Sequence, residues 1–255
     1  MKNNKPLISI ILPVHNHAHH LRESLKSIAK QSYRNIEILA IDDFSKDGSY
    51  KILRDFAKKD KRLKVRRNVK RYGIGVTLNR LVQKAKGAYF AFMDAEDISS
   101  RDRIKKQLNY LNSDTDVVAL GTQCFFIDKN EKILGKSKFP KENESIYGSP
   151  LHGVSMQFET VMINKNLLPK DVLRFDTKSN PFMYSDVFLK LLPYGKFANL
   201  RNYLHYHRNH PKAYFKDLRK NLIALIQLFI KSITLYNYSS SVRSFFAPII
   251  KSVNF

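Results

Sequence analysis

The sequence predicts an α/β fold with a mainly parallel sheet and helices on both faces. Short apolar runs alternate with amphipathic segments along roughly the first 120 residues, the pattern that strand–helix–strand units produce. The apolar runs are continuous rather than alternating, as in strands that are buried on both faces. Two of the runs end in clustered carboxylates, and open α/β sheets bind their ligands at the carboxyl ends of the strands.

Local patterns mark the individual elements. Leu21, Leu25 and Ile28 recur at helical spacing, and Gly87 ends a later helical segment. The pattern weakens in the middle of the chain, but it again predicts a helix at 183–192 and a strongly apolar segment at 222–230. The expected strands of the first part are 7–12, 36–41, 63–65, 89–93 and 117–120, and its expected helices are 19–31, 49–58, 73–86 and 101–111.

Two familiar nucleotide-binding loops are absent from the sequence. The turn after the first strand reads Pro13-Val14-His15-Asn16 instead of Gly-x-Gly-x-x-Gly, and no Gly-x-x-x-x-Gly-Lys-Ser/Thr loop occurs. A nucleotide bound to this fold is therefore expected to be held by other groups.

The chain is strongly basic, with 45 Lys and Arg residues against 22 Asp and Glu and a formal net charge of +23. This charge favours polyanionic partners such as phosphorylated substrates or an anionic membrane face. Residues 51–71 hold eleven of the basic side chains. The alternative to a polyanion-binding surface there is a solvated helix and loop. No zinc-finger, helix-turn-helix or aromatic RNA-binding pattern occurs, so nucleic acid is not an expected partner.

Targeting signals are also sparse. Cys124 is the only cysteine, which excludes an intrachain disulfide and fits a reducing compartment. The apolar run after Pro6 is too short for a signal peptide, and no uncharged apolar stretch reaches the ~18 residues of a spanning helix. We expect a cytoplasmic protein. From position 211 onward, seven basic residues and one acid lie among apolar ones, which is typical of an anchor on the inner face of the cytoplasmic membrane or of a helix packed on the main domain.

The acidic clusters offer the clearest chemistry. Asp42 and Asp43 can accept hydrogen bonds from a nucleobase N–H or a ribose hydroxyl, or they can simply form a turn. Asp94, Glu96 and Asp97 supply three carboxylates, the oxygen donors that Mg²⁺ and Mn²⁺ prefer, and such a cation would neutralise a nucleotide's diphosphate. The alternative is that Asp97 only caps the helix that follows.

The histidines and a later aspartate carry weaker signals. Four histidines at positions 15, 17, 19 and 20 are interpreted as a solvated loop, because no acid or cysteine pattern nearby completes a familiar metal site. A second group lies at positions 205, 207 and 210. Asp186 precedes an apolar helix, where a lone aspartate is usually a first-turn charge.

An ordered series of segments resembles the family 2 glycosyltransferases, which have the GT-A fold. Ile10–Asn16 resembles the family's first strand and Pro-Val-Tyr-Asn turn, and Ile41–Ser49 resembles its Val-Asp-Asp-Gly-Ser-Thr-Asp-Gly-Ser. Each motif is weak alone, but the ordered series over the first half of the chain is specific. The remaining matching segments are 24–28, 31–33, 35–37, 73–79, 85–89, 93–99, Asp102-Arg103 and Gln107.

The resemblance implies a role for each cluster. Asp97 and Glu96 would hold Mg²⁺ or Mn²⁺, and Asp43 would contact a uracil-type base. Ser185–Leu191 resembles the family's Glu-Asp-x-x-Leu-x-x-Arg segment, which assigns the general base to Asp186. Tyr206–His210 resembles its Tyr-Arg-x-His ending. The implied nucleotide-binding residues are Pro13, Val14, His15, Asn16, Asp42, Asp43, Asn79, Asp94 and Glu96, and the candidate acceptor contacts are His152, His207 and His210.

The expected activity is that of an inverting, metal-dependent glycosyltransferase. It would move a hexose or N-acetylhexosamine from a nucleotide-diphosphate sugar, with UDP as the expected nucleotide, to a hydroxyl of a glycan or lipid-linked acceptor in bacterial cell-envelope polysaccharide or lipopolysaccharide synthesis. Four residues depart from the family pattern: Phe44 replaces Gly, His15 replaces Tyr, Glu96 replaces Asp and Ser185 replaces Glu. These departures leave an alternative, a nucleotide- or polyanion-binding module that kept the fold and lost transfer.

The expected organisation is a catalytic domain followed by a tail. The GT-A domain would span 1–211, with a nucleotide-sugar-binding half at 1–125 and an acceptor-binding half at 126–211. A basic, apolar helical tail would follow at 212–255.

Overall fold

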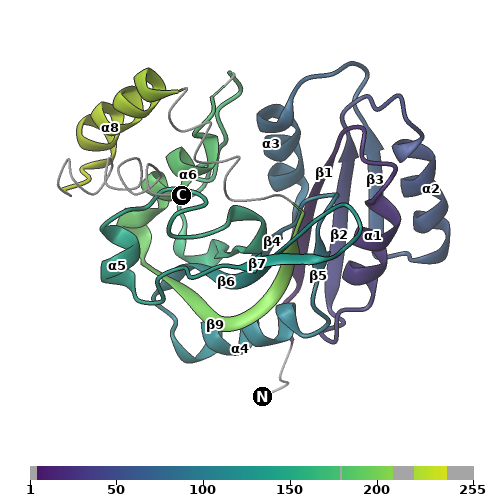
Figure 1. Cartoon of the computed structure of the whole chain (residues 1–255), viewed down its shortest axis with the longest axis horizontal. Coiled ribbons are helices and arrows are strands. Elements are labelled where there is room, and N and C mark those ends of the chain that lie inside the picture. The colour runs from purple at the N-terminus through teal and green to yellow at the C-terminus, as the bar shows by residue number, and fades with distance from the viewer. Residues whose placement is uncertain (1–4, 179, 209–220, 240–255) are drawn as a thin grey trace.

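One nine-stranded sheet runs through the molecule in the order β3-β2-β1-β4-β8-β6-β9-β5, with β7 paired to β6 (Figure 1). The computed structural model describes residues 5–178, 180–208 and 221–239. The strands are β1 Ile8–Val14, β2 Ile36–Asp42, β3 Leu63–Arg67, β4 Tyr89–Phe92, β5 Ile98–Ser99, β6 Val117–Ile127, β7 Ile133–Lys136, β8 Met162–Asn164 and β9 Lys196–His207.

Helices cover both faces of the sheet, as the sequence predicts. Ile10 and Leu12 of β1 pack with α1, α2 and α4, whereas Ile11 between them packs with α3 and α6. A strand buried on both faces needs apolar side chains at every position, which explains the continuous runs. The helices are α1 Leu21–Ala29, α2 Ser49–Lys59, α3 Ile74–Lys84, α4 Arg103–Ser113, α5 Asn143–Tyr147, α6 Met183–Leu191 and α8 Leu222–Tyr236, with 3₁₀ turns η1 Phe158–Thr160, η2 Lys165–Leu167 and η3 Leu192–Tyr194.

The first four strands are parallel, so their carboxyl ends lie at one edge of the sheet. Val14, Asp42 and Arg67 occupy paired positions at the ends of β1, β2 and β3. The later strands mix directions: β8 is antiparallel to β4 and β6, β9 is parallel to β6, and β5 is antiparallel to β9. The prediction of a mainly parallel sheet is therefore confirmed.

The expected parts of the chain share elements of the structure. β6 continues to Ile127, so the expected division at position 125 falls inside a strand, and both halves share the same sheet. The predicted C-terminal helical extension is present as α8, while residues 212–220 and 240–255 of the expected tail lie outside the described residues. Within the described ranges, no helix combines the length and apolarity needed to cross a bilayer.

Gln107 in α4 connects its own helix to β6 and η1. Its Nε2 donates to the carbonyl oxygens of Leu120 and Thr160 at 2.7 and 2.8 Å, and its Oε1 accepts from Arg103 Nε at 3.2 Å. Gln107 is fully buried, so each of these groups would lose its partner without gaining water.

We therefore expect Gln107→Leu to lower the free energy of unfolding by about 2–4 kcal/mol, because buried polar groups are left unpaired. Urea denaturation followed by circular dichroism measures the change. Gln83→Leu, at an exposed position of α3, is the matched control and should leave the midpoint almost unchanged. Equal midpoints for both variants would show that the Gln107 hydrogen bonds contribute little.

Candidate active site

The loop after β1 joins the two acidic clusters that the sequence singled out. His15 Nδ1 donates to the carbonyl oxygen of Asp43 at 2.8 Å, and His17 Nδ1 lies 2.7 Å from Glu96 Oε1. β1 lies between β2 and β4, so this loop is placed between the ends of both strands. The acidic clusters therefore gather at one edge of the sheet. The interpretation of this histidine loop as merely solvated is wrong for His15 and His17, because both side chains bind neighbouring segments.

Asp43 holds the loop that leads into α3. Its Oδ1 accepts from Tyr72 N at 2.9 Å and from Asn68 Nδ2 at 2.7 Å, and its Oδ2 accepts from Gly73 N at 2.7 Å. Gly73 has φ 89°, a conformation that glycine adopts without steric cost. Only 4% of Asp43 is exposed, so its carboxylate already has its partners inside the protein. Its predicted contact with a base stays a prediction.

Asp42 and Phe44 shape the turn next to Asp43. Asp42 Oδ2 accepts from Ser45 N and from Arg67 Nε, each at 3.1 Å, and Oδ1 is buried without a hydrogen-bond partner among the described residues. Phe44 has φ 63°, a region that favours glycine, which accounts for the glycine that the family pattern carries there. The Arg67 guanidinium lies 5.4 Å from the centre of the Phe44 ring and packs against it.

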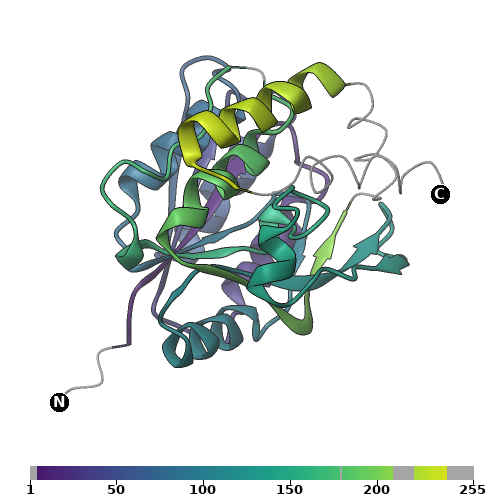
Figure 2. The ribbon, with the colours of Figure 1, turned by 90° about the vertical axis from the view of Figure 1, so that its left-hand side faces the viewer.

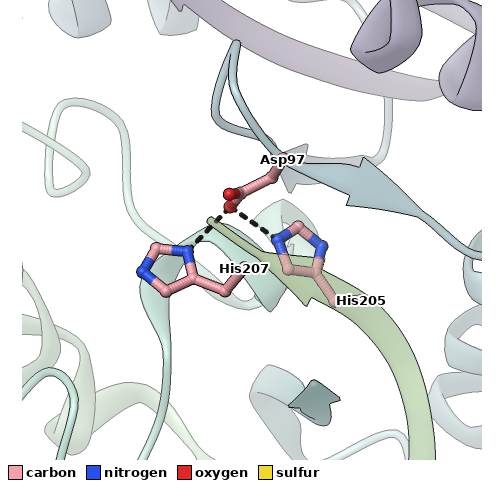
Figure 3. Close-up of side chains that lie close together, drawn as sticks. All are labelled: Asp97, His205 and His207. Atoms are coloured by element: carbon pink, nitrogen blue, oxygen red, sulfur yellow. Dashed lines mark hydrogen bonds and ion pairs between the residues drawn. The ribbon is translucent and has the colours of Figure 1, made fainter. Parts of the chain in front are cut away.

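Asp97 is the centre of a buried network between the ends of β4 and β9 (Figure 3). Its Oδ2 lies 2.8 Å from His205 Nε2 and 2.9 Å from His207 Nδ1, and its Oδ1 accepts from Arg208 N at 2.8 Å. Asp97 and His205 are almost completely buried. On the far side of His205, Arg103 Nη1 lies 3.4 Å from Nδ1.

The pKa values of the two histidines shift in opposite directions, although both lie beside Asp97. Burial lowers the pKa of His205 to about 4, despite Asp97 beside it. Burial also opposes the charged form of His207, but the adjacent Asp97 outweighs it and raises the pKa of His207 to about 9. Burial alone would raise the pKa of Asp97, yet the histidines hold it well below its usual range. Near neutral pH the site therefore holds an aspartate anion, an imidazolium at His207 and a neutral His205.

The other acids of this loop have separate partners. The hydrogen bond with His17 lowers the pKa of Glu96, although burial opposes it. Burial and the charge of Asp97 raise the pKa of Asp94 to about 6, and Asp94 Oδ1 accepts from Glu96 N at 2.9 Å. Glu96 thus points to His17 and Asp97 to the β9 histidines. A cation shared by Glu96 and Asp97 stays a prediction.

Glu159 in η1 is a buried acid that the sequence reasoning missed. Its Oε2 accepts from Gln157 Nε2 at 2.7 Å, and the same amide nitrogen lies 3.2 Å from His207 Nε2. Burial raises the pKa of Glu159 to about 7, with His207 opposing the shift and Asp97 adding to it. If the Gln157 amide turns, its oxygen can accept from both a protonated Glu159 and the His207 imidazolium, so this amide can serve either protonation state.

The site offers a donor set for a divalent transition metal. Single ligand atoms of Asp97, His205 and His207 all lie within 4.8 Å of one another. Two imidazoles and one carboxylate suit Mn²⁺ or Zn²⁺ better than Mg²⁺, which prefers oxygen ligands. Ligands about 2.1 Å from one ion lie roughly 3 Å apart, close to the distances between Asp97 Oδ2 and the two ring nitrogens. The residues therefore fit such an ion, provided that His207 gives up its extra proton.

Asp186 lies at the start of α6 beneath α8, as Figure 2 shows for the two helices. Its Oδ1 accepts from Lys231 Nζ at 2.6 Å and from Tyr236 Oη at 2.9 Å, and its Oδ2 lies 2.8 Å from Lys190 Nζ. The described hydrogen bonds of its carboxylate go to α8 and not to the 94–97 loop. The neighbouring Ser185 Oγ accepts from His152 N at 3.0 Å, which ties α6 to the segment before η1.

The other predicted site residues have diverse positions. Burial lowers the pKa of His152 to about 3, and its Nδ1 accepts from Phe158 N at 3.2 Å. Asn79 Nδ2 donates to the carbonyl oxygen of Phe175, and Asn79 Oδ1 accepts from Phe175 N, at 2.8 Å each. Pro13 and Val14 end β1, Asn16 N donates to Ser45 Oγ at 2.9 Å, and His210 lies outside the described residues.

The fold and the acidic carboxyl edge define an α/β protein of the GT-A type. Residues 9–167 match Glycosyl transferase family 2, and the chain belongs to this family. A segment of 174 residues is 34% identical to an uncharacterized glycosyltransferase of Haemophilus influenzae, covering 68% of this chain and 67% of that protein. The putative teichuronic acid biosynthesis glycosyltransferase TuaG of Bacillus subtilis is 34% identical over 111 residues, 44% of either chain.

Solved structures of lower identity share the fold. The mannosyltransferase PcManGT of Pyrobaculum calidifontis, in complex with GDP-Man and Mn²⁺, superposes with a TM-score of 0.68 at 19% identity over 98% of this chain and 70% of its own. TarS of S. aureus in complex with UDP-GlcNAc has a TM-score of 0.68 at 17% identity, over 97% of this chain and 71% of its own.

Glu159 gives the site a testable pH dependence. Its folded pKa of about 7 is above the ordinary value of 4.5, so the folded state binds the proton more tightly than the unfolded state and loses stability as the pH rises between these values. We expect Glu159→Gln to match the wild type below this window and to be more stable above it, by about 3 kcal/mol at most.

Thermal unfolding across this pH range measures the difference, and Glu144→Gln at an exposed position of α5 is the control. A stabilisation of Glu159→Gln that is equal at every pH would assign the effect to packing instead of to the charge of the carboxylate.

Proposed function

We propose that the chain is an inverting glycosyltransferase that moves a hexose or N-acetylhexosamine from a UDP-sugar to a hydroxyl of a glycan or lipid-linked acceptor. The single observation that supports this most strongly is the loop after β1, which brings the Asp43 and Glu96 clusters together at the carboxyl edge of the parallel strands. Ligands bind at this edge in open α/β folds. The name of TuaG, which specifies teichuronic acid biosynthesis, favours cell-envelope polysaccharide as the product class. The UDP-GlcNAc bound in the TarS structure favours a UDP-sugar as the donor.

A divalent cation would act at the Asp97 network. Asp97, His205 and His207 would hold it, and Glu96 belongs to the same loop. Bound there, Mn²⁺ or Mg²⁺ would neutralise the charge of the nucleoside diphosphate that leaves. PcManGT, which shares the fold, was solved with Mn²⁺, and the two imidazoles of this chain favour Mn²⁺ over Mg²⁺. The buried free thiol of Cys124 suits a reducing compartment, and we place the reaction in the cytoplasm.

Asp186 is the proposed general base. A carboxylate that takes the proton of an acceptor hydroxyl in the transition state makes that oxygen a stronger nucleophile. Both Asp186 oxygens have cationic or hydroxyl partners, so one of these partners must be exchanged for the acceptor. α6 also contributes Tyr184, whose ring stacks on the ring of Phe158 with 4.3 Å between the two ring centres. Phe158 directly precedes Glu159 in the sequence. The start of α6 thereby adjoins the segment that carries Glu159.

Donor choice and metal dependence test the proposal together. We expect UDP release from one UDP-sugar of a panel, dependent on Mn²⁺ or Mg²⁺, and loss of metal-dependent donor binding in Asp97→Asn, because the amide cannot supply the anionic ligand. Calorimetry with and without metal measures binding, and circular dichroism checks that the variant folds. Tight UDP binding without transfer to any acceptor or to water would instead support the binding-module alternative. A preference for GDP- or dTDP-sugars would refute the uracil assignment.

Turnover of Asp186→Asn tests the base. We expect unchanged donor affinity and a turnover about 10²- to 10⁴-fold lower, the usual contribution of base catalysis. Lys231→Met is the control, because it breaks the same ion pair but leaves the carboxylate in place, and it should keep most of the turnover. Similar losses in both variants would mean that the pair is structural, and wild-type turnover in Asp186→Asn would remove Asp186 from the mechanism.

A further inference from the structure

α8 has two different faces. Its inner face packs on α6: Leu225 and Leu228 are buried in a cluster with Phe182 and Leu189, and Lys231 reaches Asp186. The sequence left two interpretations of this segment, a membrane anchor or a helix packed on the domain. The inner face of α8 does pack on the domain, but this packing does not explain the other face of the helix.

The outer face of α8 is apolar and exposed to solvent. Six of the eleven large hydrophobic side chains that are exposed in the described structure belong to this one helix. Most of them recur at intervals of three or four residues, so they form a stripe along one side. Soluble proteins rarely leave so many large aliphatic side chains together in water without a partner. The exposed fractions are Leu222 45%, Ile223 75%, Ile226 42%, Ile230 54%, Ile233 46% and Leu235 67%.

The length of α8 decides how it can meet a bilayer. Its 15 residues extend roughly 22 Å at 1.5 Å per residue, less than the ~30 Å of a hydrocarbon core. Its inner face is also bound to α6 through Leu225 and Lys231. The helix therefore suits a position parallel to a membrane surface, with its isoleucine stripe at the boundary between headgroups and acyl chains.

The charge of the sequence that flanks α8 indicates which kind of lipid surface it would bind. α8 contains no acid, and its single basic residue, Lys231, pairs with Asp186 on the inner face. The sequence on either side of α8, from position 211 onward, supplies six more basic residues and one acid, Asp217. Basic residues near a membrane contribute about 1 kcal/mol each on an anionic surface. The same charge disfavours a second copy of the chain as the partner, since each copy carries a net charge of +23.

We propose that the outer face of α8, from Leu222 to Leu235, docks on an anionic phospholipid surface and holds the domain there. The proposal goes beyond the proposed function, and lipid binding is measurable whether or not the chain transfers sugar, so the two can fail separately. Docking of α8 on a membrane would keep the start of α6 near lipid-linked acceptors.

Flotation of the full-length protein with vesicles tests this docking face. We expect the wild type to float with vesicles of phosphatidylcholine and phosphatidylglycerol, less so as salt is raised, and to stay unbound with phosphatidylcholine alone. Ile223→Gln/Ile230→Gln should lower the partition coefficient by at least about tenfold, because two aliphatic side chains no longer enter the lipid. The matched control is Ile133→Gln/Leu134→Gln, which removes two comparably exposed aliphatic side chains from β7 and should bind like the wild type.

Several outcomes would overturn the proposal. Absence of wild-type flotation, equal flotation of the α8 variant and the wild type, or binding that is indifferent to salt and to phosphatidylglycerol would each do so. A dimer in sedimentation velocity that Ile223→Gln/Ile230→Gln converts to a monomer would assign the face to a second copy. Flotation that appears only after deletion of residues 240–255 would assign it to the chain's own end.

Discussion

The contact of Asp97 with the end of β9 is the interaction on which the site depends. β5 consists of two residues, and it pairs with β9 so that Ile98 lies opposite Tyr206 and Ser99 opposite His205. This short antiparallel pairing brings the preceding Asp97 to the histidines, although His205 is 108 residues away in sequence. Buried charges are stable only when they are paired and hydrogen-bonded, and Asp97 meets this condition through two imidazoles and a backbone amide. The rest of the 94–97 loop, with Glu96 and His17, is held in place around this anion.

The sequence was informative where local pattern decides structure. The buried strands β1, β2 and β4 and the helices between them follow from apolar runs and helical spacing, and the ordered motifs named the family correctly. The contacts of the site were not predictable in the same way, because they join distant segments. One signal was present but unused: His205 and His207 are two residues apart, and such residues on a strand share a face. Nothing in the sequence around Glu159 distinguishes it, since its burial is a product of the fold and the charges that act on it belong to His207, Asp97 and Asp94 in distant segments.

Two departures from the family pattern have a physical explanation in the structure. Phe44 occupies a left-handed backbone conformation that costs roughly 1–2 kcal/mol for a residue with a Cβ, and its ring packs under Arg67 in partial compensation. Ser185 is fully buried and binds the backbone of His152, a position in which a longer acidic side chain would need a cation. Both replacements therefore change how neighbouring loops are held, and neither removes a carboxylate from Asp42, Asp43, Asp94 or Asp97.

The partners of Asp186 also bear on the order in which the chain acquires its structure. Lys231 follows Asp186 by 45 residues in the sequence. During synthesis, the carboxylate of Asp186 is therefore present before the Lys231 ammonium group that pairs with it. Until then only Lys190, on the same helix, can neutralise it. Burying a carboxylate that lacks its full set of partners is unfavourable, so the packed position of α6 gains its full electrostatic support only when α8 is also in place. The buried acids of β2 differ in this respect, because Glu37 and Asp42 pair with Lys64 and Arg67 of the neighbouring strand β3, fewer than thirty residues away in sequence.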